Sequence, residues 1–120
     1  MTDKLSIALA QINPTVGNIS SNIELIRIAR KSSADVGADL VVYGELSVIG
    51  YPPEDLVLKH AFQAVVKTQV EALALETLDG GPALLIGAPW RTENGLHNAV
   101  LLLDKGKIAA IRLKHELPNY

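Results

Sequence analysis

The chain contains no cysteine among its 120 residues. Disulfide bonds are therefore excluded, and so is a zinc site built on thiolates. A cysteine nucleophile is excluded within these residues as well. Neither a G-x-x-x-x-G-K-[ST] loop nor a G-x-G-x-x-G loop is present, so no nucleotide-phosphate site of these kinds is predicted.

Excess positive charge and long apolar runs are also missing. The net charge of -2 argues against a nucleic-acid partner. No apolar run approaches the length that crosses a bilayer, so no membrane association is predicted. The segment 1–4 lacks a basic region followed by an apolar one, so no secretory signal is expected, and this favours the cytoplasm.

The composition is that of a folded domain. Hydrophobic residues make up 48% of the chain and charged residues 20%, which is typical of a globular domain rather than of a disordered segment. A chain of this length can form one compact core. It shows no repeat, low-complexity stretch or linker, and we expect residues 1–120 to form part of one domain.

The hydrophobic pattern alternates between strands and helices. Continuous or alternating apolar runs indicate strands, and apolar residues at helical spacing indicate helices. The expected order is a strand over about 4–10, a helix over 19–36, a strand over 40–43, a helix over 61–78, a strand over 83–87, and a hairpin of 98–103 with 107–113. This order predicts an α/β fold with a mixed sheet: a parallel region covered by helices, with antiparallel strands added by the hairpin.

Several residues mark the helix ends. Asn18 or Asn22 can cap the first helix, and Gly37 suits its end. Pro53 and Glu54 suit a helix start, because proline is tolerated in the first turn and an acid faces the positive end of the helix dipole.

Two charged residues follow apolar strands directly. Glu45 comes after the apolar run 40–43, and Lys114 comes after the strand 107–113. Ligands of α/β sheets bind beyond the carboxyl ends of strands, where a carboxylate and an ammonium could perform acid-base chemistry and stabilise an oxyanion. Their positions alone leave an alternative open, in which both residues are ordinary solvated charges.

Other polar residues offer weaker candidates. His60, His97 and His115 lack metal-ligand spacing, and no metal site is predicted. Tyr51 and Tyr120 lie in proline-flanked segments, where each could be a partly buried loop aromatic.

Four stretches carry a family resemblance that runs over essentially the whole chain. They are IALAQINPTVGN at 7–18, GEL at 44–46, GYPPEDL at 50–56 and KHELPNY at 114–120. In this order and spacing they resemble the glutaminase domain of glutamine-dependent NAD synthetases, a branch of the carbon-nitrogen hydrolase (nitrilase) superfamily. A strand-end Glu is common to the superfamily, whereas the GYPPEDL and LPNY stretches point to this branch.

The resemblance implies a fold and a set of site residues. The fold is an α-β-β-α sandwich, of which 120 residues supply the N-terminal part, with helices on one face of the sheet. The family uses a Cys-Glu-Lys triad, in which Glu45 and Lys114 match the Glu and the Lys. Its Cys lies beyond the LPNY stretch and has no match in this chain, so the chain alone is expected to be inactive. Tyr51 and Tyr120 match tyrosines that line the glutamine pocket. The family usually has proline before the catalytic Glu, where this chain has Gly44.

The resemblance also implies partners. Glutamine is the substrate of the glutaminase domain, which needs no cofactor. A separate synthetase domain, absent here, uses ATP and Mg²⁺ to amidate deamido-NAD with the ammonia released, and members assemble as homo-oligomers. Two alternatives remain open: a stand-alone amidase of the same superfamily, and a non-catalytic interaction fragment.

Three structural expectations follow. The charged groups of Glu45 and Lys114 should lie within about 3–6 Å of each other. The Glu45 side chain should be largely sheltered. The second face of the sheet should lack cover within this chain, because apolar strands of this kind are normally buried on both faces.

Overall fold

The strands form one mixed sheet. The computed structural model describes residues 3–51 and 55–114, and its five strands follow the order β1-β2-β3-β4-β5. Their bounds are Ile7–Leu9 for β1, Leu40–Val42 for β2, Ala83–Thr92 for β3, Gly95–Asp104 for β4 and Lys107–Leu113 for β5. The first three strands are parallel, and β4 and β5 continue the sheet in antiparallel pairing. The predicted α/β class with a mixed sheet is confirmed.

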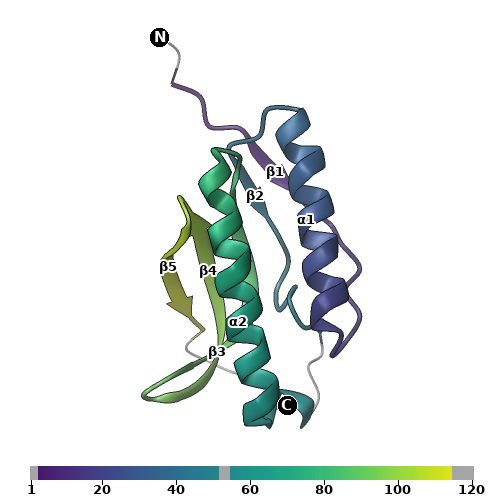
Figure 1. Cartoon of the computed structure of the whole chain (residues 1–120), viewed down its shortest axis with the longest axis vertical. Coiled ribbons are helices and arrows are strands. Elements are labelled where there is room, and N and C mark those ends of the chain that lie inside the picture. Colours follow the sequence, from purple (N-terminus) through teal and green to yellow (C-terminus); the bar gives the residue numbers. More distant parts are fainter. Residues whose placement is uncertain (1–2, 52–54, 115–120) are drawn as a thin grey trace.

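Two helices cover one face of this sheet. They are α1 (Ile19–Asp35) and α2 (His60–Glu76), accompanied by the short 3-10 helices η1 (Asp55–Leu58) and η2 (Thr77–Asp79). Both long helices run across the same side of the strands (Figure 1). They are tied together at the surface by Arg27, which donates to Glu76 at 2.7 Å.

The first helix begins and ends where the sequence predicts. Of the two candidate caps it is Asn18 that serves, since its side-chain oxygen accepts from the Ser21 N–H at 3.1 Å. Asn22 lies inside the helix, fully buried, and bridges to the backbone of Thr15 and Val48. The helix terminates at Val36, and the following Gly37 has a φ of 84°, the left-handed conformation that glycine adopts without strain.

The second helix buries a narrow stripe against the sheet. Val66, Val70 and Leu73 are fully buried, whereas Val65 and Leu78 are exposed. Val65 lies one residue, or about 100°, round the helix from Val66 and falls at the edge of the stripe. Leu78 follows the end of α2, in the tighter turn of η2. The predicted helix start at Pro53 and Glu54 lies outside the described residues.

The third strand is longer than predicted, and so is the fourth. The prediction ended β3 at Gly87 and began β4 at Asn98, whereas the two strands pair as a hairpin out to Thr92 and Gly95. Pro89, which carries no N–H for a ladder, and the polar residues after Trp90 concealed this extension.

The core lies between the helices and one face of the sheet. Strand residues on that face are fully buried; they include Val41, Leu84, Ile86, Leu101 and Leu103. On the opposite face Ile7 is 51% exposed, Leu9 78% and Val100 43%. The expectation of an uncovered second face is therefore confirmed for the described part of the chain. We call it the open face.

Among residues 3–51 and 55–114, no helix is long and apolar enough to cross a membrane.

Candidate active site

Glu45 stands on a loop that is fixed to the sheet by its neighbours. The chain leaves β2 after Val42, and residues 46–50 are all buried. The Val48 N–H donates to the carbonyl of Gly87 at 3.1 Å, and the Gly87 N–H donates to the Ser47 hydroxyl at 3.2 Å. Leu46, directly after Glu45, has a φ of 51°. That left-handed conformation is strained for leucine, and such strain persists only where the surroundings enforce it.

Gly87 allows this close approach. A Cβ atom at this position would overlap the backbone nitrogen of Leu46 and lie 2.9 Å from the carbonyl oxygen of Gly44. Only glycine therefore lets β3 pass directly beneath the loop. In contrast, a Cβ at Gly44 would meet no atom within 4 Å, so the backbone there has room for a side chain.

Tyr43 anchors the start of the loop from the helix side. Its hydroxyl donates to the carbonyl oxygen of Ile26 in α1 at 2.8 Å. Burial raises the pKa of Tyr43 far above its usual value, so the phenol stays protonated as a donor. This residue supports the end of β2 and takes no part in acid-base chemistry.

A β-bulge places Lys114 on the same side as Glu45. Leu102 pairs with Ala110 and Leu103 with Ile108, so β5 carries one extra residue, Ala109. Because side chains alternate between faces, a one-residue shift reverses the orientation of every residue beyond it. Lys114 thereby comes opposite Asn98, and its N–H donates to the Asn98 carbonyl at 2.9 Å.

The two charges meet at the edge of the open face. The Nζ atom of Lys114 lies 3.1 Å from Oε1 of Glu45, within the predicted range. The same oxygen also accepts a hydrogen bond from Nδ2 of Asn98. These three side chains lie around a depression of about 410 Å³ whose floor includes Gly87 and Val100.

The predicted shelter of Glu45 is wrong for the described part of the chain. Its side chain is 45% exposed and that of Lys114 is 47% exposed. The apolar residues that flank Glu45 in sequence are buried beneath the loop, while the carboxylate points over the open face, which no described residue covers.

The structure places some of the other candidate residues, while others lie outside the part of the chain that it describes. Tyr51 is 52% exposed and lies in a bend at the end of the loop. Tyr120 and His115 fall outside the described residues. His60 begins α2, and His97 lies on β4 next to Asn98 but on the opposite face. No three metal-ligating side chains gather within residues 3–51 and 55–114.

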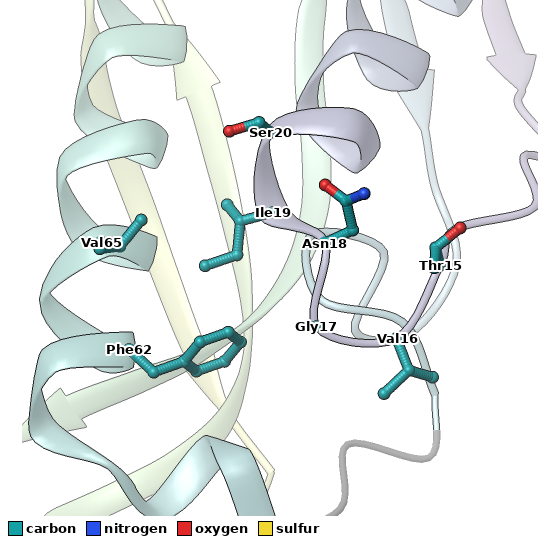
Figure 2. Close-up of a pocket in the computed structure, with 8 residues that line it drawn as sticks. All are labelled: Thr15, Val16, Gly17, Asn18, Ile19, Ser20, Phe62 and Val65. Carbon is teal, nitrogen blue, oxygen red and sulfur yellow. The ribbon is translucent and has the colours of Figure 1, made fainter.

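A larger cleft lies elsewhere. It measures about 700 Å³ and lies between the start of α1 and the α2 residues Phe62 and Val65 (Figure 2). None of its lining side chains is ionisable, and the side chain of Asn18 is occupied as the helix cap. Although larger, this cleft lacks the groups that acid-base catalysis needs, so we assign the site to the depression beside Glu45.

Asn98 is the one member of the site that the sequence analysis missed. It is 7% exposed and directly precedes the apolar residues 99–103 of β4, in phase with Val100 and Leu102 on the open face. A polar residue in phase with apolar positions of a strand, next to the strand that Lys114 follows, is the sequence signal that indicates Asn98.

Comparison with known proteins identifies the family of this chain. The carbon-nitrogen hydrolase family matches residues 6–120. The glutamine-dependent NAD(+) synthetase of Rhodobacter capsulatus is 44% identical over 119 residues, covering 99% of this chain and 21% of the relative. The enzyme of the same name from Thermotoga maritima is 35% identical over 117 residues, covering 98% and 20%. The chain thus spans about a fifth of the length of these curated relatives.

Solved structures agree in fold. A glutamine-dependent NAD+ synthetase from Acinetobacter baumannii superposes with a TM-score of 0.84 at 35% identity, over 95% of this chain and 21% of that one. An amidase from Nesterenkonia sp. has a TM-score of 0.78 at 24% identity, over 97% and 44%, which shows likeness of fold. The sheet of this chain, its helices on one face and the match over residues 6–120 make it a member of the carbon-nitrogen hydrolase family.

Proposed function

We propose that this chain is the N-terminal part of the glutaminase domain of a glutamine-dependent NAD(+) synthetase. The observation that carries the proposal is the 3.1 Å contact between Lys114 and Glu45 at the edge of the open face. Relatives of that name, alike over nearly the whole chain, support the choice of substrate.

The residue types suit amide hydrolysis. A thiolate nucleophile divides the reaction into formation and hydrolysis of a thioester. Glu45 takes the thiol proton, delivers it to the departing ammonia, and then activates the water that cleaves the thioester. Lys114 stabilises the negative charge that develops on the carbonyl oxygen.

The chain supplies two of the three groups required. It has no cysteine, so we assign the nucleophile to residues beyond Tyr120 of the whole protein. The proposed pocket is completed by Tyr51 and Tyr120, which bind glutamine.

The ATP-dependent step is assigned to a synthetase domain outside this chain. Among the described residues no metal-ligand cluster is found, and the sequence has no phosphate-binding loop. In the whole protein ATP and Mg²⁺ serve the amidation of deamido-NAD by the ammonia released. We place such an ATP-consuming enzyme in the cytoplasm, as a homo-oligomer.

A stand-alone amidase is the second candidate. It is favoured by the fold likeness to the Nesterenkonia amidase, of which this chain covers 44%. The Glu45–Lys114 pair serves either enzyme, so the distinction rests on what becomes of the ammonia.

The test uses the whole gene product that contains this chain. It is supplied with ATP, Mg²⁺ and deamido-NAD, and with either glutamine or ammonium as nitrogen donor. A synthetase forms NAD from both donors. Ammonia release from amides without NAD formation identifies the stand-alone amidase, and failure to hydrolyse any amide removes both candidates.

A further inference from the structure

We propose that Asn98 is a positioning residue that determines which oxygen of Glu45 acts as the base. The inference rests on the proposed glutaminase function. In this positioning role Asn98 contacts Glu45 and Lys114 and touches neither the substrate nor the nucleophile.

Asn98 contacts both charged members of the site. Its side-chain Nδ2 donates to Oε1 of Glu45, and its backbone carbonyl accepts from the N–H of Lys114 at 2.9 Å. The Lys114 Nζ donates to the same Oε1 at 3.1 Å. One residue of β4 therefore sets the position of the carboxylate through its side chain and the position of the lysine through its backbone.

This arrangement makes the two oxygens of Glu45 unequal. Oε1 receives two donors, whereas no described residue donates a hydrogen bond to Oε2. Each carboxylate oxygen can accept a proton, but the one engaged by two donors is the weaker acceptor. Oε2 is therefore left as the oxygen that receives the thiol proton.

Asn98 is better placed than Glu45 to define geometry. It is 7% exposed and lies on a strand paired on both sides, opposite Pro89 in β3 and next to Lys114 after β5. Glu45 is 45% exposed and would otherwise sample several rotamers. An amide also directs the carboxylate without adding charge, so it leaves the pairing with Lys114 undisturbed.

The test compares Asn98→Leu and Asn98→Asp in the whole protein, which carries the nucleophile. Leucine removes the donor at similar volume, and aspartate keeps the shape but at neutral pH offers only acceptors. We expect kcat for glutamine hydrolysis to fall about 10- to 100-fold in both variants, as for loss of a hydrogen bond to a charged group. KM for glutamine should stay within about twofold, because substrate binding does not use Asn98.

Gln63→Leu provides the matched control. Gln63 is also a buried amide, 8% exposed, but it bonds to Arg91 and to the Val57 carbonyl, away from Glu45. Its removal should lower thermal stability without changing kcat. The inference is overturned if either Asn98 variant keeps the wild-type kcat. It is equally overturned if both variants only raise KM and lower the melting temperature as Gln63→Leu does. A wild-type protein that hydrolyses no glutamine would instead remove the proposed function, and this role with it.

Discussion

The Nζ atom of Lys114 lies 3.1 Å from Oε1 of Glu45, although 69 positions separate the two residues in the sequence. Both side chains are nearly half exposed. Ion pairs of this exposure contribute about 0–1 kcal/mol to stability. Folding alone therefore gives little reason to bring these two residues together, whereas the proposed chemistry requires both.

Replacement of either Glu45 or Lys114 should therefore leave the protein folded. We expect Glu45→Gln and Lys114→Met each to change the free energy of unfolding by less than about 1 kcal/mol. Thermal melts of the purified variants measure this. Arg30→Met is the contrasting variant, because the Arg30 side chain is only 11% exposed and holds Asp79 and the Pro82 carbonyl. Unfolding of the site variants at much lower temperature would assign the pair a structural role.

Gly87 should be essential to the position of Glu45. In Gly87→Ala the new methyl group would press on the backbone of Leu46 and Gly44, so the loop must shift. Such overpacking costs about 1–3 kcal/mol, and we expect at least a tenfold loss of glutamine hydrolysis.

Gly44→Ala is the matched control for that substitution. Position 44 has space for a methyl group and no left-handed φ, so alanine should leave stability unchanged or raise it by about 0.4–1 kcal/mol. Equal activity of the two variants, measured as ammonia release, would show that the contact beneath the loop is unimportant.

Asp79 should contribute an acid-sensitive part of the stability. The paired hydrogen bonds from Arg30, followed by the Gly81 N–H, lower the pKa of Asp79 from 3.8 to about 2. A carboxyl with a depressed folded-state pKa stabilises the fold above its unfolded pKa, and this stabilisation is lost as the pH falls towards the folded value. The loss is expected between pH 4 and pH 2.

The size of this effect is limited by solvent. The Asp79 side chain is 56% exposed, so screening reduces its contribution to about 1 kcal/mol or less. Urea unfolding at several pH values should show a shallower acid loss in Asp79→Asn than in the wild type. Parallel curves for the two proteins would mean that the Arg30 contact does not favour the carboxylate.

The sequence predicted the elements that place Glu45 and Lys114, because apolar runs and strand-end charges are local signals. It did not predict how Lys114 comes to face Glu45. That depends on the bulge at Ala109, which lies in a run of small apolar residues with no turn signal. Without the bulge the alternation of faces would place Lys114 on the helix side.

Two further features of the site also depend on contacts between residues that are distant in the sequence, so the sequence does not predict them. The left-handed conformation of Leu46 occurs where its backbone lies against Gly87, a residue distant in the sequence, and leucine itself gives no indication of it. The apolar neighbours of Glu45 in the sequence predict a sheltered carboxylate, and the structure contradicts this prediction. Those neighbours face the core, while the carboxylate faces the open side of the sheet.

Residues 1–120 expressed alone should release no ammonia from glutamine, since they contain no thiol.

The isolated chain should also self-associate through the open face, where Leu9 and Val100 are exposed. Sedimentation velocity should show that Leu9→Lys with Val100→Lys reduces association. Leu75→Lys should leave association unchanged. Leu75 is also exposed, at 61%, but it lies on α2 and not on the open face. Turnover by a monodisperse wild-type fragment would mean that the nucleophile is not a cysteine.

We propose Glu45 as the acid-base group of a glutaminase site that feeds a separate amidation step. The most direct measurement is NAD formation by the whole protein carrying Glu45→Gln, with glutamine and with ammonium as alternative nitrogen donors. We predict that the glutamine-driven rate falls by about 10²–10⁴-fold while the ammonium-driven rate is unchanged. Glutamine-driven synthesis at the wild-type rate, or an equal loss with both donors, would contradict the account.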